Sequence, residues 1–136
     1  MRSLFDTNIL VYADSADEPI KQRQAVELIK THRAAGTAVL CTQVLQEFAN
    51  VALRKLQLPP ALVRERLAFY SRFDTVATSA DLIASAIDLH VLHQLSFYDA
   101  LVIQAAKAGG CSRVLTEDLQ HGATWGGVLV SNPFKA

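Results

Sequence analysis

Short apolar runs alternate with longer segments of helical periodicity along most of this chain. Strand-length apolar runs begin near residues 3, 38, 73, 113 and 128, and the segments between them repeat apolar residues every three or four positions. This alternation is typical of βαβ units, in which helices join parallel strands and cover the faces of their sheet. The sequence therefore predicts an α/β fold, a three-layer α/β/α sandwich with a central, mainly parallel sheet of four to five strands.

Turn and capping residues set the limits of the expected elements. Gly36 is placed to end the second helix, while Thr42 and Ser79 are good N-caps for later helices. The segment 100–106 is apolar except for Gln104, which predicts a helix buried on most of its circumference. We expect strands over residues 3–5, 38–41, 73–77, 113–115 and 128–130, and helices over residues 9–13, 17–35, 42–58, 61–71, 80–93 and 96–108.

Length and composition limit the class of protein. The 136 residues match one domain, so a single domain over 1–136 is expected. A chain that is 51% hydrophobic and 19% charged is neither disordered nor of low complexity. Thirteen basic residues balance thirteen acidic ones, so a nucleic acid would have to be held by local basic patches or by metal ions.

Targeting features point to a cytoplasmic protein. The first residues lack the basic start and apolar run of a secretory signal. No stretch offers the roughly 20 apolar residues of a membrane helix, so no membrane partner is expected. Cys41 and Cys111 stand in apolar stretches without CxxC spacing, which favours two buried, reduced thiols over a disulfide.

Acidic residues follow the predicted strands at the edge of the sheet where ligands bind in this architecture. Asp6 directly follows the first strand, and Glu47 lies early in the helix after the second. Asp99 lies in the first turn of the buried helix, and Glu117 and Asp118 follow the fourth strand. Because the carboxyl ends of parallel strands meet at one edge, we expect acids from distant parts of the chain to gather there.

A divalent cation is the partner that best suits these acids. No lysine or arginine lies in the segments that carry Asp6, Glu47 and Asp99, whose neighbours are largely apolar. The apolar neighbours Val44 and Phe48 predict that the Glu47 side chain is shielded from solvent. Mg²⁺ or Mn²⁺ takes oxygen ligands, and one or two such ions would suit in-line hydrolysis of a phosphodiester.

Each acid also has a purely structural interpretation. Asp6 could cap a helix, and Asp99 has the capping-box spacing from Ser96. Glu117 and Asp118 could be ordinary turn residues. Their joint position at one sheet edge favours a site over these separate explanations.

The chain resembles the PIN-domain ribonucleases, and in particular the VapC-like toxins of prokaryotic toxin–antitoxin pairs. The resemblance spans nearly the whole chain, and four motifs in the typical order carry it. They are Leu4-Phe5-Asp6-Thr7-Asn8-Ile9-Leu10, the segment 43–50 with Gln46-Glu47-Phe48, Ser96-Phe97-Tyr98-Asp99-Ala100-Leu101, and Leu115-Thr116-Glu117-Asp118-Leu119.

The resemblance implies roles for individual residues. It implies that Asp6, Glu47, Asp99 and Asp118 bind Mg²⁺ or Mn²⁺ and are the catalytic acids. Asp6 and Asp99 would be the strongest ligands, and Asp118 the more variable position. Thr116 would orient a carboxylate or a metal-bound water, and Asn8 would fix the loop or contact phosphate. Glu117 matches no family position, so it is left out of the metal set. The resemblance further implies a homodimer with two sites along one groove, and a VapB-like antitoxin whose tail inserts there.

Two basic segments are candidates for contact with RNA. Residues 54–72 carry five basic side chains against one acid, and residues 21–33 carry four against one. Either segment could hold the RNA backbone or simply form a solvated helix face. The RNA-contact candidates are Arg54, Lys55, Arg64 and Arg66.

The leading hypothesis is a metal-dependent endoribonuclease, the toxin of a type II toxin–antitoxin pair. A PIN nuclease of RNA processing and a non-catalytic PIN-like interaction module are the alternatives. A phosphoryl-accepting, receiver-like or phosphatase-like sheet is disfavoured, since Asp6-Thr7-Asn8 lacks the second Asp of a DxD arrangement.

Overall fold

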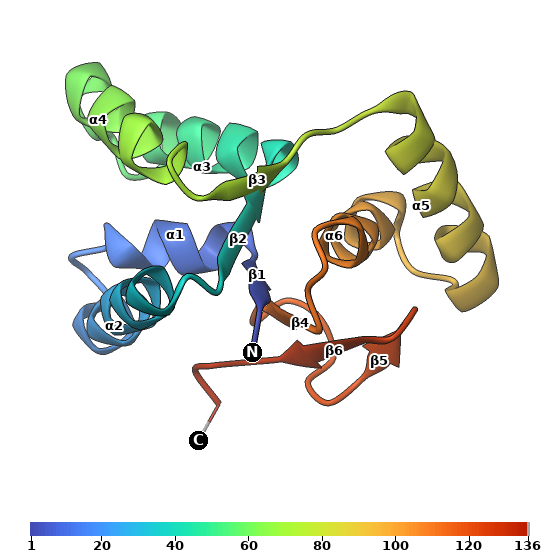
Figure 1. Ribbon diagram of the computed structural model, residues 1–136. Coiled ribbons are helices and arrows are strands. Elements are labelled where there is room, and N and C mark those ends of the chain that lie inside the picture. Colours follow the sequence, from blue (N-terminus) through green and yellow to red (C-terminus); the bar gives the residue numbers. More distant parts are fainter. Residues whose placement is uncertain (136) are drawn as a thin grey trace.

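A six-stranded sheet forms the centre of the computed structural model, which describes residues 1–135 (Figure 1). Residue 136, the last of the predicted domain, lies outside the described residues. The strand order is β3-β2-β1-β4-β6-β5, and every neighbouring pair is parallel except β5 with β6. The strands are β1 (Ser3–Phe5), β2 (Ala38–Cys41), β3 (Asp74–Val76), β4 (Arg113–Leu115), β5 (Thr124–Trp125) and β6 (Val128–Ser131).

Helices cover both faces of this sheet, which confirms the predicted α/β sandwich. One side carries α1 and α2, with α3 and α4 packed above them, and the other carries α6 with α5 outside it (Figure 1). The helices are α1 (Thr7–Ala13), α2 (Pro19–Ala35), α3 (Thr42–Arg54), α4 (Pro60–Tyr70), α5 (Ala80–His93) and α6 (Phe97–Ala108).

The sheet has one strand more than the sequence predicts. The additional strand, β5, contains only two residues and pairs with β6 through Thr124 and Trp125. Gly126 and Gly127, both with positive φ, close the hairpin between them. Two residues are too few to produce a recognisable apolar alternation, so only pairing with β6 reveals this strand.

Several predicted helix limits also need correction. The first helix begins at Thr7 rather than residue 9, and the second begins at Pro19 rather than residue 17. The helix after β2 ends at Arg54 rather than near residue 58, and Gln57 has a φ of 53°, which is incompatible with continuing it. Its N-cap is Cys41, while the Thr42 hydroxyl donates to the Val76 carbonyl oxygen at 3.4 Å. Gly36 does end α2 in the left-handed conformation, with a φ of 70°.

The hydrophobic core surrounds β1 and α6. Leu4 and Phe5 of β1 are fully buried, and six residues of α6 are buried, all within the 100–106 segment. Cys41 and Cys111 are both buried and free. Because each connecting helix runs back across the sheet, α1, α3 and α6 all begin at the carboxyl ends of the strands.

Within residues 1–135, no helix has the length and apolar character needed to cross a bilayer.

We predict that Gly109→Ala destabilises the protein through a steric clash at the end of α6. A Cβ at this position would lie 2.8 Å from the Val76 Cγ2 and 3.3 Å from the Val39 Cγ1, both on short, stiff side chains. The expected loss is about 1–3 kcal/mol in the free energy of unfolding, measured by urea denaturation. Adding Val76→Ala should recover part of it, and strictly additive losses would contradict the clash.

Candidate active site

Asp6 stands at the carboxyl end of β1 and connects the two central strands. Its backbone N–H donates to the Leu115 carbonyl oxygen of β4 at 3.0 Å. Its Oδ1 accepts from the Thr7 N–H at 2.8 Å, which makes Asp6 the N-cap of α1. Its Oδ2 accepts from the Thr116 hydroxyl at 2.8 Å. The capping role and the site role considered in the sequence therefore coincide in one side chain.

The environment of Asp6 opposes its ionisation. The pKa of Asp6 is raised from 3.8 to about 6, mainly by burial, and the nearby charges of Asp118 and Glu47 act in the same direction. The hydrogen bonds from Thr116 and Thr7 lower this pKa but do not cancel the effect of burial. Glu47 and Asp118 are therefore each close enough to Asp6 to disfavour its charged form.

Glu47 is held by two neutral donors on the wall of a groove. Its Oε2 accepts from the Thr7 hydroxyl at 2.8 Å, and its Oε1 accepts from the Gln43 side-chain amide at 2.7 Å. The prediction that apolar neighbours shield Glu47 from solvent is wrong, because it is exposed while Val44 and Phe48 point into the core. Gln43 is buried, and its own Oε1 has no hydrogen-bond partner among the described residues.

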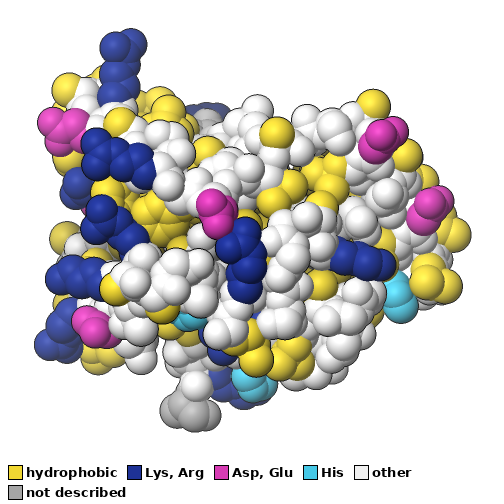
Figure 2. Space-filling view, in the orientation of Figure 1, with side chains coloured by type: hydrophobic (Ala, Val, Ile, Leu, Met, Phe, Trp, Pro, Cys, Tyr) yellow, Lys and Arg dark blue, Asp and Glu magenta, His cyan; other side chains and the backbone are white. Residues whose placement is uncertain are grey.

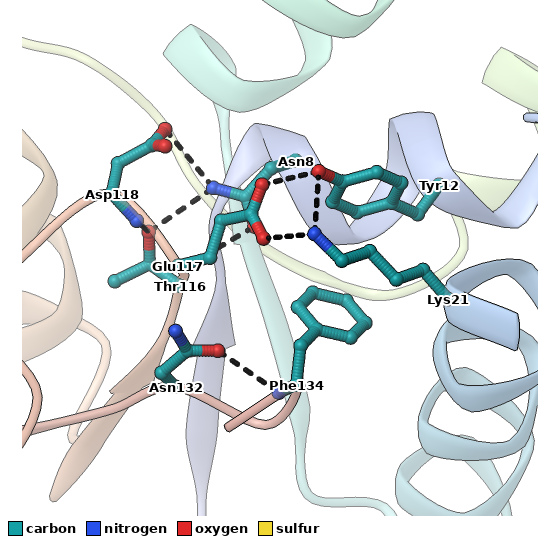
Figure 3. Close-up of polar contacts among 8 residues, drawn as sticks. All are labelled: Asn8, Tyr12, Lys21, Thr116, Glu117, Asp118, Asn132 and Phe134. Atoms are coloured by element: carbon teal, nitrogen blue, oxygen red, sulfur yellow. Dashed lines mark hydrogen bonds and ion pairs between the residues drawn. The ribbon is translucent and has the colours of Figure 1, made fainter. Parts of the chain in front are cut away.

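Thr116 and Asn8 connect Asp118 to Asp6, and Figure 3 shows their contacts with Asp118. The Thr116 hydroxyl accepts from the Asn8 Nδ2 and from the Asp118 N–H, each at 3.1 Å. With both bonds accepted, its single proton points to Asp6. Asn8 also donates to the Asp118 Oδ2 at 3.1 Å. These contacts suit the positioning roles predicted for Asn8 and Thr116.

Glu117 makes the contacts that the sequence pattern does not foresee (Figure 3). Its Oε2 forms a 3.0 Å ion pair with the Lys21 Nζ of α2, and its Oε1 accepts from the Tyr12 hydroxyl of α1. Lys21 also lies 3.3 Å from the Tyr12 hydroxyl oxygen. Lys21 and Glu117 are 96 positions apart, so no local spacing in the sequence signals their contact.

The contacts of Asp99 differ from those of the other predicted acids. It sits in the first turn of α6, where its backbone N–H donates to the Ser96 side chain at 3.1 Å. The direction of α6 places this turn at the same sheet edge as Asp6. Within the described part of the chain, however, no hydrogen bond or ion pair joins Asp99 to Asp6, Glu47 or Asp118.

A groove of about 560 Å³ opens beside these residues. Its wall is strongly acidic, with Lys55 its one basic side chain among the residues described. The groove lies between α1, α3, the loop that follows α1 and the loop that follows β4. The acidic residues that line it are Asp17, Glu18, Glu47, Glu117 and Asp118.

The donor set fits a hard divalent cation. Asp6, Glu47 and Asp118 offer only carboxylate oxygens, and none of the ion pairs found in residues 1–135 neutralises them. Burial, with a smaller contribution from repulsion by Asp118 and Glu47, raises the pKa of Asp6, and a bound cation would offset both effects. No three His, Cys, Asp or Glu side chains in that range are already grouped closely enough to hold a metal ion. The carboxylates would therefore have to close around a cation on binding.

The predicted RNA-contact residues have different surroundings. Lys55 reaches the groove, and Arg54 and Arg64 are exposed. Arg66 is instead paired with Asp14 at the end of α1, with its Nε 3.0 and 3.1 Å from the two carboxylate oxygens. Figure 2 shows Lys and Arg side chains gathered along the side formed by α2 and α4. A role of this basic side in holding RNA stays a prediction.

Comparison with known proteins identifies the family. The family model described as PIN domain matches residues 3–124. The chain belongs to the PIN-domain family. The residues matched by the family model include Asp6, Glu47, Asp99 and Asp118. No match to the chain is found among curated proteins.

Solved structures of PIN proteins share this fold. A toxin–antitoxin complex from Klebsiella pneumoniae is 21% identical, with a TM-score of 0.73 over 98% of this chain and 99% of that one. VapBC2 from Rickettsia felis, bound to a DNA fragment from its promoter, is 20% identical, with a TM-score of 0.66 and coverages of 97% and 98%. VapC20 of Mycobacterium tuberculosis, a toxin that cleaves the sarcin–ricin loop, is 18% identical, with a TM-score of 0.61 and coverages of 82% and 86%.

We predict that Asp6→Asn stabilises the metal-free protein at neutral pH. Because the pKa of Asp6 is raised in the folded state, the unfolded chain loses this proton first and wild-type stability falls as the pH rises from 3.8 to about 6. Asparagine avoids this cost and still caps α1. The gain at pH 7.5 in EDTA is expected to reach about 3 kcal/mol and to shrink towards pH 4.

Urea denaturation at both pH values measures this difference. Asp88→Asn, which removes an exposed acid on α5, is the matched control for the loss of one charge. A gain that is equal at pH 4 and pH 7.5 would contradict an origin in the ionisation of Asp6.

Proposed function

We propose that this PIN-domain chain is a Mg²⁺- or Mn²⁺-dependent endoribonuclease and the toxin of a type II toxin–antitoxin pair. The observation that carries the proposal is the position of Glu47 and Asp118 near Asp6, to which Thr7 and Thr116 link them through shared hydrogen bonds. These carboxylates meet at the carboxyl edge of the sheet, beside an open groove, without a basic partner among residues 1–135. A structural role alone would not favour such uncompensated charge.

The four acids predicted from the sequence are the proposed metal ligands. Asp6, Glu47 and Asp118 form the grouped set, and Asp99 completes it from the start of α6. A bound Mg²⁺ or Mn²⁺ would activate a water and offset charge on the phosphate that is attacked. Thr116 orients Asp6, and Thr7 with Gln43 orients Glu47, so neutral donors preset the carboxylates without neutralising them.

RNA is the proposed substrate, held by its phosphates rather than by an overall positive field. The chain has no net charge, and the groove wall itself is acidic. Lys55 is the basic residue best placed to hold a phosphate next to the acids. Arg54 and Arg64 extend this contact along the chain, while the pairing of Arg66 with Asp14 makes it a less available contact.

A VapB-like antitoxin and a second copy of the chain are the proposed protein partners. Support for the antitoxin comes from the similar fold of the Klebsiella toxin–antitoxin complex and of Rickettsia VapBC2. We propose that residues 1–136 act as a single domain, that two copies place their sites along one groove, and that the antitoxin tail enters that groove. An RNA-processing role outside a toxin–antitoxin pair would use the same acids.

A non-catalytic interaction module is the second candidate. It is favoured by one observation, the lack of a ready-made three-ligand metal site in the described residues. Under this alternative the groove would bind a partner without cleaving RNA. Metal-dependent cleavage separates the two candidates.

We predict that purified, antitoxin-free protein cuts RNA only when Mg²⁺ or Mn²⁺ is present. Total RNA, which includes the sarcin–ricin loop, and isolated tRNA serve as substrates, and EDTA should abolish cleavage. Asp6→Asn and Asp118→Asn keep the shape of the side chains and remove ligand charge, so each should reduce the rate by at least about 100-fold. Gel analysis of the products measures this.

Asp88→Asn is the matched control for these variants and should cleave at the wild-type rate. Cleavage that persists in EDTA would contradict the metal dependence. Absence of cleavage by folded protein with either metal and with both substrates would favour the interaction module.

We predict that Lys55→Gln weakens RNA binding through the loss of one phosphate contact. In an Asp6→Asn background, which binds without cutting, the slope of log affinity against log salt should fall by about one. Lys107→Gln, at the far end of α6 from the site, is the matched control and should leave the slope unchanged. Fluorescence anisotropy over a salt series measures both, and equal slopes for the two variants would exclude Lys55 as a phosphate contact.

A further inference from the structure

The loop that follows β4 carries Asp118 but has few contacts of its own. The Thr116 N–H donates to the Ser131 carbonyl oxygen at 3.0 Å, which fixes the start of the loop. Beyond it, the Glu117 N–H reaches the Asn8 Oδ1 at 3.4 Å, and Asp118 is exposed with Asn8 as its side-chain partner. Asn8 and Thr116 hold Asp118 directly, and the Glu117 side chain is a further anchor of the same loop.

Two helices hold the Glu117 side chain (Figure 3). Lys21 of α2 contacts one carboxylate oxygen at 3.0 Å, and the Tyr12 hydroxyl of α1 donates to the other. The side chains of Lys21 and Glu117 are 35% and 22% exposed, so this ion pair is partly shielded from solvent. Two separate anchors on one carboxylate restrict its rotation much more than a single surface ion pair would.

The end of the chain supports the Lys21 side chain. The Lys21 Nζ lies 4.8 Å from the centre of the Tyr12 ring and 5.6 Å from that of Phe134. The two rings pack edge to face with their centres 5.0 Å apart, and the Phe134 N–H donates to the Asn132 Oδ1 at 2.9 Å. Segments from both ends of the chain thus converge on one ammonium group.

We propose that Lys21 and Tyr12 are positioning residues that act through Glu117 to hold the loop 116–118, and with it Asp118, at the metal site. This role rests on the proposed function, since it assigns Asp118 to the metal. Tyr12 and Glu117 form part of the groove wall, and Lys21 stands behind them. In this proposal Glu117 does not bind the metal. Its charge fixes the position of the neighbouring Asp118.

The opposing charges of Lys21 and Glu117 separate positioning from simple electrostatics. If the two residues affected the metal only through their charge, Lys21→Met would tighten Mn²⁺ binding and Glu117→Gln would weaken it. If they hold the loop, both substitutions release the same anchor and both weaken binding. Outer residues of this kind change metal affinity by about 10-fold, which is the effect expected for each.

The experiment measures Mn²⁺ affinity by calorimetry and hydrogen exchange of the loop in the metal-free protein. Lys21→Met and Glu117→Gln should each weaken Mn²⁺ binding and speed exchange over residues 116–119, and the double variant should be no worse than either one. Lys21→Arg should keep the Mn²⁺ affinity and the loop exchange close to those of the wild type, because arginine carries the same positive charge. Lys30→Met, an exposed lysine further along α2, is the matched control.

The outcomes distinguish this proposal from the proposed function. If the wild-type protein binds no Mn²⁺ but the loop still exchanges faster in both variants, the anchoring role of Lys21 and Glu117 would stand and the proposed metal site would be overturned. Opposite changes in Mn²⁺ affinity for the two variants would overturn positioning. Unchanged loop exchange would overturn it as well, whatever the affinity.

Discussion

The pairing of β1 with β4 is the constraint on which the site depends. These strands are separated by about 110 positions in the chain, yet Phe5 lies opposite Leu115 in a parallel register. Asp6 and Thr116 are the next residues of the two strands, and the register brings the Thr116 hydroxyl to the Asp6 carboxylate at 2.8 Å. A shift of one residue would turn either side chain to the other face of the sheet and separate them.

The site keeps negative charge while holding it in place with neutral groups. Thr7, Gln43, Asn8 and Thr116 donate to the carboxylates, and none of them carries a charge. Burial opposes the ionisation of Asp6 and raises its pKa, although the hydrogen bonds from Thr116 and Thr7 lower it. Such stored electrostatic strain is typical of functional sites, where a ligand rather than the protein completes the charge balance. Lys21 is paired with Glu117 and leaves the other acids uncompensated.

Local signals in the sequence predict much of the fold and several roles in the site. The apolar runs predict β2 and β4 with their observed limits, and Gly36 marks the end of α2. Signals that depend on partners are lost: β5 exists because it pairs with β6, and Glu47 is exposed because α3 turns Val44 and Phe48 inward. In the second case the apolar neighbours were visible in the sequence, but which of them faced the core was not.

The sequence by itself determined the α/β class, the PIN resemblance and the acids that follow the strands, since periodicity, capping residues and short motifs are all local. Only the tertiary structure decided which acids meet. Shared hydrogen bonds through Thr7 and Thr116 link Glu47 and Asp118 to Asp6. No such link joins Asp99 to them in the described residues, and Glu117 is paired with Lys21. Strand register and helix packing set these distances, and both depend on contacts between residues far apart in the chain.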